Sequence, residues 1–131
     1  MTTAQSATTR YSTKITSVGS MVPDFVEKGI LIFFGEGAPA ELHDISVLHQ
    51  PEVTVGGLEV GDVLTLGGRQ FPILAVGAVA NDNLVKLGHI DLKFNGETTP
   101  PLAGDVCLPK EAAPLPTPGS VFSVVAPSNG A

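Results

Sequence analysis

Three histidines, His43, His49 and His89, are the residues in this chain best suited to chemistry near neutral pH. An imidazole can act there as a nucleophile, a proton carrier or a metal ligand. His49 is followed directly by Gln50-Pro51, and a proline ends or interrupts a strand. This position predicts that the His49 side chain lies at the end of a strand, where it is both held and reachable.

Other chemistries find less support in the sequence. The potential metal ligands have no tight spacing of the Cys-x-x-Cys kind; they are His43, Asp44, His49, His89 and Cys107. The Gly-x-Ser-x-Gly elbow of serine hydrolases and the Gly-Lys-Ser or Gly-Lys-Thr ending of a P-loop are absent. Cys107 lies between Val106 and Leu108, an apolar setting that keeps a thiol inert. We therefore expect no metal, nucleotide or other cofactor.

The elements that must position the histidines are predicted to be short strands. Gly29–Phe34 is a continuous apolar run that is too short for a typical helix. The runs 63–66 and 70–76 flank Gly67-Gly68, a dipeptide that supplies the positive φ angles of a tight hairpin. Pro72 should then lie at a sheet edge or a bulge, because it cannot donate a ladder hydrogen bond.

The run His89–Phe94 alternates in the manner of a half-buried strand and ends at the turn dipeptide Asn95-Gly96. Its apolar residues Ile90, Leu92 and Phe94 share one face, so His89 should point away from the apolar side. This strand could also run beside the strand that carries His49.

Helix is predicted at two short segments only. Asn81 or Asp82 can cap a helix that runs through Leu87 and stops at Gly88. A second helical turn is predicted from Pro39 to His43, with the proline at an early helical position.

These elements predict an all-β fold: a single barrel-like antiparallel sheet with one or two short helical segments. The composition agrees, with 15 Gly, 11 Pro and no Trp among 131 residues. We expect one domain over residues 1–131, with an ordered body at about 11–125. The first ten or so residues and the tail Pro127–Ala131 are small and polar, so both should fray.

Charge and targeting signals narrow the class of partner. A formal net charge of -6 argues against nucleic acid, which requires clustered Lys and Arg. The N-terminus has no apolar signal-peptide core, and no later stretch is apolar for long enough to span a bilayer. A lone cysteine asks for no oxidising compartment. We expect a cytoplasmic protein with no direct membrane insertion, and the sequence leaves homo-oligomer formation open.

Several separated blocks of the sequence carry a resemblance to a known family. The blocks are Gly35–Leu42 with His49 seven positions on, Ala75–Leu84, and Leu87–Phe94. In this order and spacing, the chain resembles the glucitol/sorbitol-specific enzyme IIA component of the bacterial phosphoenolpyruvate-dependent sugar phosphotransferase system, from about Thr13 to Val124. The resemblance implies a β-barrel-like fold and a transient phosphohistidine. It places the phosphorylated histidine at His49 and matches His89 to a second histidine of the family pattern.

The resemblance also implies a path for the phosphoryl group. His49 would attack the phosphohistidine of the general phosphocarrier protein and pass the group to the sugar-specific IIB/IIC membrane components. The hydroxyls of Ser46 or Thr54 could steady the phosphate, and His89 could orient His49 or bind the phosphate. Docking partners would need a fairly flat, partly apolar surface, for which the candidates are Leu48, Pro51 and Val53.

One departure from the family pattern concerns the active site directly. The relative used for comparison has a second histidine two residues after the active one, whereas this chain has Gln50-Pro51 there. A helper role for that neighbour is therefore not carried over, and the sugar specificity stays open. Both termini are also longer than expected.

Two other classes of function remain compatible with the residues alone. The first is a non-catalytic β-barrel binding module, in which glycine-rich turns shape a pocket and the histidines are incidental. The second is a small metal-dependent enzyme that uses His43, His49 and His89.

Overall fold

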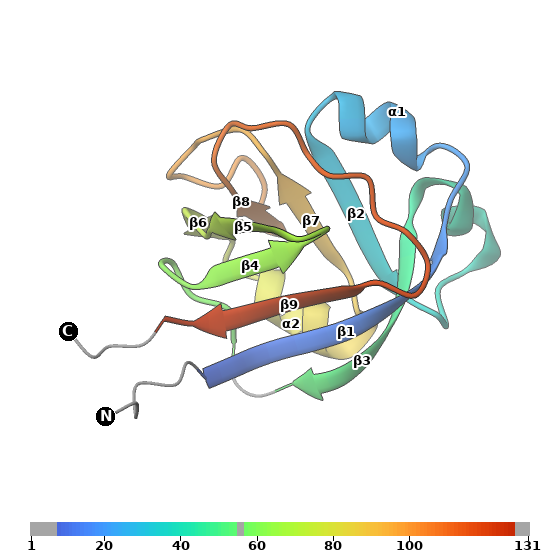
Figure 1. Cartoon of the computed structure of the whole chain (residues 1–131), viewed down its shortest axis with the longest axis horizontal. Coiled ribbons are helices and arrows are strands. Elements are labelled where there is room, and N and C mark those ends of the chain that lie inside the picture. The colour runs from blue at the N-terminus through green and yellow to red at the C-terminus, as the bar shows by residue number, and fades with distance from the viewer. Residues whose placement is uncertain (1–7, 55–56, 128–131) are drawn as a thin grey trace.

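The chain forms one curled nine-stranded sheet with three short helical segments among the residues that the structure describes (Figure 1). This computed structural model describes residues 8–54 and 57–127, apart from the side chain of Val53. The strands are β1 (Thr8–Val18), β2 (Ile30–Gly35), β3 (Val47–Thr54), β4 (Val63–Leu66), β5 (Arg69–Pro72), β6 (Ala75–Val76), β7 (Ile90–Lys93), β8 (Asp105–Cys107) and β9 (Val121–Ala126). The helices are α1 (Val22–Glu27), a 3-10 helix (Ala40–Ile45) and α2 (Ala80–Leu87).

The order of the strands explains the curl of the sheet. The order is β5-β4-β9-β1-β3-β2-β7-β8-β6, so β5 and β6 lie at opposite edges although only Ile73 and Leu74 separate them in the chain. The Ile73 amide donates to the Asp62 carbonyl at 2.8 Å, and the Leu74 amide donates to the Cys107 carbonyl at 2.9 Å. Ile73 and Leu74 thus bond to segments at opposite edges of the sheet. The sheet must therefore curl until its two edge strands, β5 and β6, approach each other. The predicted barrel-like sheet is confirmed.

Strand directions add one feature that the sequence did not indicate. Most neighbouring pairs are antiparallel, but β2 with β3 and β7 with β8 are parallel pairs. Parallel neighbours need a longer crossover, and the chain supplies one through the 3-10 helix after β2.

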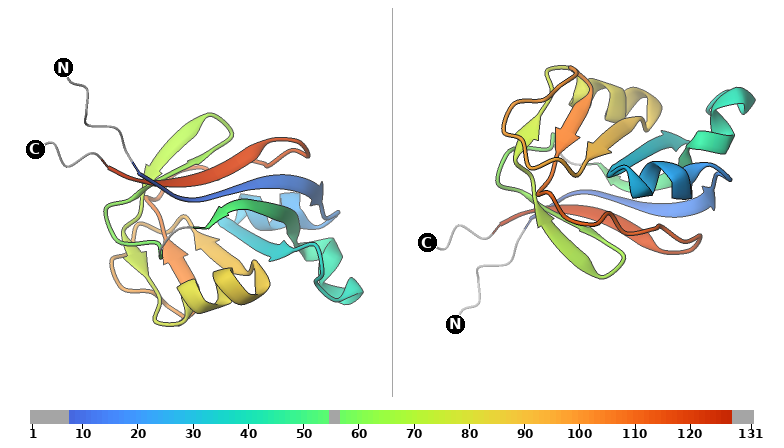
Figure 2. Two further views of the ribbon diagram at one scale, coloured as in Figure 1. Left: turned by 90° about the horizontal axis from the view of Figure 1, so that it is seen from below. Right: turned by 90° about the horizontal axis from the view of Figure 1, so that it is seen from above.

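The inside of the curled sheet is filled by large apolar side chains. The largest fully buried members include aromatic rings from four different strands or loops, and the set is Tyr11, Ile15, Leu31, Phe33, Leu64, Leu66, Phe71, Ile73, Ile90, Leu92, Leu108 and Phe122. Helix α2 lies along the β7 side of the sheet, away from the β4–β5 hairpin (Figure 2). Ala80 and Leu84 are its buried residues.

The hairpin and the alternating strand are confirmed. β4 and β5 pair across Gly67 and Gly68, whose φ angles are +61° and +76°. Pro72 lies in the edge strand β5, as its missing amide requires. The predicted run 70–76 does not remain one strand, because the chain leaves the β5 ladder after Pro72 and begins β6 at Ala75.

The helical predictions are confirmed in place but not in every detail. α2 ends at Leu87, and Gly88 follows in the left-handed conformation with φ +64°. Asn81 does not cap it; its side chain instead accepts from the Leu58 amide at 2.8 Å and donates to the Leu58 carbonyl at 3.1 Å. Pro39 precedes the 3-10 helix. Helix α1 was not predicted.

Two expectations about strand ends were wrong. β3 continues through Pro51 to Thr54, so His49 lies inside a strand and not at its end. β3 tolerates Pro51 because β2 pairs with β3 only as far as His49. β1 already begins at Thr8, so the first ten residues do not all fray; the remaining predicted frayed ends, residues 1–7 and 128–131, lie outside the described residues.

Candidate functional site

His49 is enclosed by the core of the sheet. It pairs with Ile15 across the β1–β3 ladder, and its side chain is 0% exposed. The Phe33 ring meets the imidazole edge to face at 5.6 Å between centroids, and the Tyr11 ring lies at 6.2 Å. The expected reachable side chain is therefore covered in this state.

Both nitrogens of the His49 ring have a partner at short distance. Nδ1 lies 2.6 Å from the Thr13 hydroxyl oxygen, and Nε2 lies 2.6 Å from the Gly88 carbonyl oxygen. A carbonyl can only accept, so Nε2 must carry the hydrogen and donate to Gly88. In the neutral ring Nδ1 then accepts from the Thr13 hydroxyl.

Burial favours this neutral form of His49. Desolvation lowers the pKa of His49 below the ordinary histidine value, and the bond to Gly88 and the charge of Glu36 offset only part of that effect. A neutral imidazole has a lone pair, which a nucleophile requires.

Two glycine backbones close over Nε2. A Cβ added at Gly88 would meet the Gly35 amide nitrogen at 2.7 Å and His49 Nε2 at 3.2 Å. Gly88 also has φ +64°, which disfavours any other residue. The contact between β2 and the end of α2 therefore depends on glycine, and it covers one side of the imidazole.

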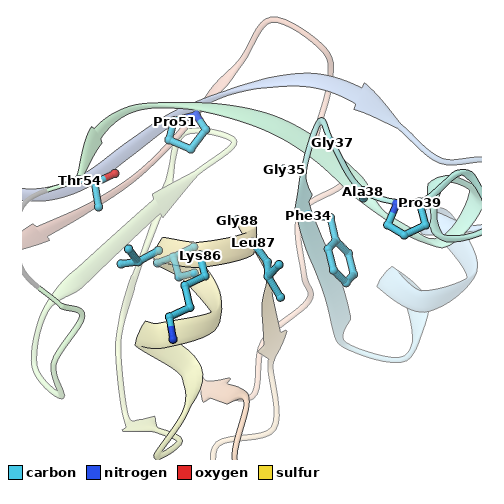
Figure 3. A pocket seen from close by; sticks show the side chains of 12 residues that line it. Phe34, Gly35, Gly37, Ala38, Pro39, Pro51, Thr54, Lys86, Leu87 and Gly88 are labelled. Carbon is cyan, nitrogen blue, oxygen red and sulfur yellow. The ribbon is translucent and has the colours of Figure 1, made fainter.

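A pocket of about 460 Å³ opens on the other side of these glycines (Figure 3). Its walls come from the end of β2, the loop before the 3-10 helix, the far half of β3 and the end of α2. The lining residues are Phe34, Gly35, Gly37, Ala38, Pro39, Pro51, Thr54, Leu84, Val85, Lys86, Leu87 and Gly88. Since Gly88 bonds to Nε2 and also lines the pocket, Nε2 is the nitrogen on the pocket side.

His89 occupies the opposite face of the sheet. Its ring stacks on Phe34 at 4.1 Å between centroids, and its Nδ1 lies 3.2 Å from the Phe33 carbonyl oxygen. Its Nε2 lies 3.8 Å from Asp91 Oδ2. Burial raises the pKa of Asp91, with His89 acting in the other direction. The prediction that His89 points away from the apolar side is confirmed.

The strands of His49 and His89 are not neighbours, although the sequence left that arrangement open. β2 lies between β3 and β7. The link between the two histidines is through the backbone: the Gly88 carbonyl, one residue before His89, accepts from His49.

Comparisons with known proteins agree with one another. Residues 10–123 match the model of the family described as PTS system glucitol/sorbitol-specific IIA component. The chain is 39% identical over 115 residues to the PTS system glucitol/sorbitol-specific EIIA components of Shigella flexneri and Escherichia coli (strain K12), which covers 86% of this chain and 91% of each relative. The chain belongs to this IIA family.

A solved structure supports the assignment of this IIA family member. The crystal structure of a PTS system IIA component from Enterococcus faecalis V583 is similar with a TM-score of 0.70 and 26% sequence identity. The match covers 85% of this chain and 96% of that one. The fold and the family thus agree, and membership supports a role in a phosphotransferase system. No helix in the described part of the chain is long and apolar enough to cross a membrane.

The remaining sequence candidates of this IIA protein lie apart from His49. His43 Nε2 lies 2.8 Å from the Ala38 carbonyl oxygen on the 3-10 helix side. Cys107 is buried in β8, and burial raises the pKa of its thiol. Within residues 8–54 and 57–127, no three or more His, Cys, Asp or Glu side chains gather as a metal site would require. The three histidines proposed as metal ligands are not brought together.

Three residues of this site were missed from the sequence. Thr13 and Gly88 hold the His49 ring, and Lys86 contributes a positive charge to the pocket lining. Tyr11, Thr13 and Ile15 are all buried in an alternating pattern, so the period-two pattern of β1 was a signal for Thr13. Gly88 was predicted only as the end of a helix, and Lys86 was given no role.

Proposed function

We propose that this protein is a cytoplasmic phosphocarrier, a single domain that accepts a phosphoryl group on His49 from the general phosphocarrier protein and passes it to the sugar-specific IIB component. The observation that carries the proposal is the neutral imidazole whose Nε2 lies directly beneath the Gly35–Gly88 contact on the pocket side. Membership of the glucitol/sorbitol-specific family makes a hexitol the sugar class of the pathway.

Nε2 is the nitrogen that we assign to the transfer. The phosphoryl group arrives through the pocket, and Nδ1 faces the buried strand β1. Phosphoryl transfer passes through a loose transition state, so the protein needs chiefly an in-line nucleophile and charge on the equatorial oxygens. A neutral imidazole meets the first need without a metal or a nucleotide, once its hydrogen is on Nδ1 and the lone pair is on Nε2.

Access to Nε2 requires the Gly88 carbonyl to turn aside. In the described state this carbonyl accepts the Nε2 hydrogen and Gly35 lies against Gly88. Glycine has no Cβ to restrict its backbone, so the peptide after Gly88 can rotate, at the cost of the 3.2 Å bond from the His89 amide to the Asn83 carbonyl. The buried arrangement is then the resting state, and docking of a phosphorylated partner exposes Nε2.

The pocket walls supply candidates for the phosphoryl oxygens. Lys86 and the exposed residue Thr54 line the pocket. Lys86 can neutralise the transferred charge, and the Thr54 hydroxyl can donate to it. Ser46 is buried and is not among the lining residues, so it is the weaker of the two hydroxyls named from the sequence.

The apolar rim of the pocket is the proposed docking face for both partners. Val85 and Leu87 on α2 are 63% and 57% exposed, and Pro51 is exposed across the opening. Of the surface candidates named from the sequence, Leu48 is buried and the Val53 side chain lies outside the described residues. Since in-line transfer brings two active sites together, whichever protein delivers the group must cover this rim.

His89 supports the site from outside the pocket in this proposal. Its ring contacts Phe34, a pocket residue, and its backbone follows Gly88. It can thus hold the Phe34 wall of the pocket in place, without contacting the phosphoryl group. Its loss should slow transfer and leave the phosphorylated residue unchanged.

The test is intact mass after incubation with phosphoenolpyruvate, enzyme I and the general phosphocarrier protein. Wild type and His89→Ala should each gain one acid-labile phosphoryl group, and His49→Ala should gain none. Phosphorus NMR of the product should show the Nε2-linked isomer. Phosphorylation of His49→Ala would refute the assignment of the residue, and an unmodified wild type would favour the binding-module alternative.

A further inference from the structure

Thr13 is the most deeply buried polar partner of the proposed nucleophile. Its side chain is 0% exposed, and its hydroxyl lies 2.6 Å from His49 Nδ1. A buried hydroxyl costs free energy unless it makes its hydrogen bonds inside the protein. Valine has the same shape as threonine, yet this core position in an otherwise apolar setting holds a hydroxyl.

The two nitrogens of His49 have partners of unlike chemistry. The Gly88 carbonyl only accepts, whereas the Thr13 hydroxyl can both donate and accept. In the resting ring Thr13 donates to Nδ1. When the hydrogen is on Nδ1, the same hydroxyl can rotate about its C–O bond and accept it, with no movement of the strand.

We propose that Thr13 is a positioning residue for phosphoryl transfer: its hydroxyl reverses from donor to acceptor and so stabilises the reactive and phosphorylated forms of His49. This inference rests on the proposed function, because it assigns a role within the same reaction. Thr13 acts only through His49 and does not contact the phosphoryl group.

The proton and electron balance of the step requires this reversal. Attack by Nε2 needs its lone pair, so the ring hydrogen must first be on Nδ1. When the Gly88 carbonyl turns aside, water reaches the site, takes the hydrogen from Nε2 and supplies one to Nδ1, which leaves the lone pair on Nε2. The Nε2–P bond forms as the N–P bond of the partner's phosphohistidine breaks, and the electron pair of that bond stays on the partner's nitrogen. His49 then carries the phosphoryl group on Nε2 and a hydrogen on Nδ1, in a cationic ring. Within the described residues, the Thr13 oxygen is the hydrogen-bonding atom in reach of that buried N–H.

The geometry of the strands fixes Thr13 in place for this role. Thr13, Lys14 and Ile15 pair in continuous register with Pro51, Gln50 and His49, so Thr13 is the diagonal neighbour of His49 on the inner face of the β1–β3 ladder. Register shifts flank this regular stretch on both sides, between Ser12 and Thr13 and between Ile15 and Ser17. The hydroxyl is therefore held on β1 and β3 and not on a mobile loop.

The experiment compares Thr13→Val, Thr13→Ser and Tyr11→Phe. Thr13→Val removes the hydroxyl and keeps the shape, while Thr13→Ser keeps the hydroxyl. Tyr11→Phe is the matched control: it deletes a buried hydroxyl of β1 that lies beside the Thr13 side chain but makes no hydrogen bond to His49, so it separates the direct bond to Nδ1 from the general loss of a buried hydroxyl. All proteins carry nitrogen-15 labelled histidine, and the imidazole signals of His49 are followed against pH by NMR.

Thr13→Val should lower the pKa of His49 below that of wild type, because the imidazolium needs an acceptor at Nδ1 as well as at Nε2. It should also slow phosphorylation by the phosphocarrier protein by about 10- to 100-fold, the range expected for one hydrogen bond to a charged group. Thr13→Ser and Tyr11→Phe should stay within about threefold of wild type, roughly 0.6 kcal/mol.

Unchanged titration and unchanged rate in Thr13→Val would overturn the proposal, as would an equal loss in Tyr11→Phe. If Thr13→Val does not fold, wild type decides alone: after phosphorylation the His49 Nδ1–H signal should exchange slowly with water, and a rapidly exchanging signal would overturn the role. If neither wild type nor any variant is phosphorylated, the proposed function fails. The pKa of His49 in wild type and Thr13→Val still measures whether the Thr13 hydroxyl forms a hydrogen bond with Nδ1.

Discussion

The surroundings of His49 and His89 differ although one strand serves both. Consecutive residues of β2 contact them: the Phe33 ring meets His49 inside the sheet, and the Phe34 ring stacks on His89 outside it. His49 is fully buried with both ring nitrogens bonded, whereas the His89 side chain is 20% exposed beside Asp91. The face of the sheet, and not the residue type, separates the two sites.

This difference indicates how the fold assigns roles. Inside the sheet, burial disfavours charge and leaves a neutral ring with a defined hydrogen position, as a nucleophile needs. Outside the sheet, an aromatic face and a nearby carboxylate suit a ring that supports its neighbours. A substitution beside one histidine can therefore be controlled by a substitution beside the other.

The largest expected effect is on stability, from truncation of the ring against His49. Phe33→Ala should lower the free energy of unfolding by about 3–5 kcal/mol, because Phe33 is 0% exposed and leaves a cavity. Phe34→Ala should cost only about 1–2 kcal/mol, since Phe34 is half-buried at the pocket wall. Urea denaturation of both variants measures the contrast, and equal losses would contradict it.

The next effect concerns the glycine between the two histidines. Gly88→Ala should cost roughly 2–3 kcal/mol, because its φ is +64° and its new Cβ would meet the Gly35 backbone at 2.7 Å. Gly119→Ala, with φ +90° and nothing within 4 Å, should cost roughly 1–2 kcal/mol. Gly37→Ala, in open space in the same pocket, should change stability by less than about 0.5 kcal/mol. Thermal unfolding of the three variants separates steric contact from backbone strain.

A smaller effect should appear in the pH dependence of stability. Burial lowers the pKa of folded His49, so below the unfolded histidine pKa of about 6.5 the unfolded chain binds the extra proton. Stability from this group is therefore complete above about pH 6.5 and is lost as the pH falls toward the folded pKa, by at most about 1.4 kcal/mol per pH unit. The raised pKa of Asp91 acts with the opposite sign, since that group favours the folded protein below its unfolded pKa.

Replacement of His49 by Gln should remove this fall in the free energy of unfolding at low pH, while His89→Gln should retain it. Denaturant midpoints between pH 5 and 7.5 give the measurement. A slope that survives in His49→Gln would assign the pH dependence to another group and would break the proposed contrast between the two rings.

The smallest effect should come from the outer ion pair. Asp91 and His89 lie 3.8 Å apart with side chains 22% and 20% exposed, so the pair is weak, and burial already penalises the Asp91 charge. Asp91→Asn should change the free energy of unfolding at pH 7 by less than about 0.5 kcal/mol. Phosphorylation rates should stay within about twofold. A large loss of the phosphorylation rate in Asp91→Asn would show that the His89–Asp91 pair takes part in phosphoryl transfer.

Local patterns of the sequence predicted the parts of the fold that depend on neighbouring residues. The Gly67-Gly68 hairpin, the inward face of β7 and the stop of α2 at Gly88 were all available from turn chemistry and periodicity. Helix α1 is six residues long, too short to show a helical period, which is why it was missed.

The arrangement of the site depended on information that is not local. Thr13 and His49 are 36 residues apart, and their contact depends on which residues of β1 and β3 pair, in a regular stretch that register shifts flank on both sides. The continuation of β3 through Pro51 depends on the end of its neighbour β2 at Gly35. Periodicity identifies which residues face inward, but pairing and bulges decide which of them meet.

The two strand prolines also have a consequence for self-association. Across the described residues, β5 and the far half of β3 are stretches that lack a second neighbouring strand, and they contain Pro72 and Pro51. A free strand edge is a template for pairing with another chain, and a proline removes one of the donors that such pairing needs. The outermost strands are also limited to four and two residues, so both the prolines and the short edges disfavour edge-to-edge pairing with another chain.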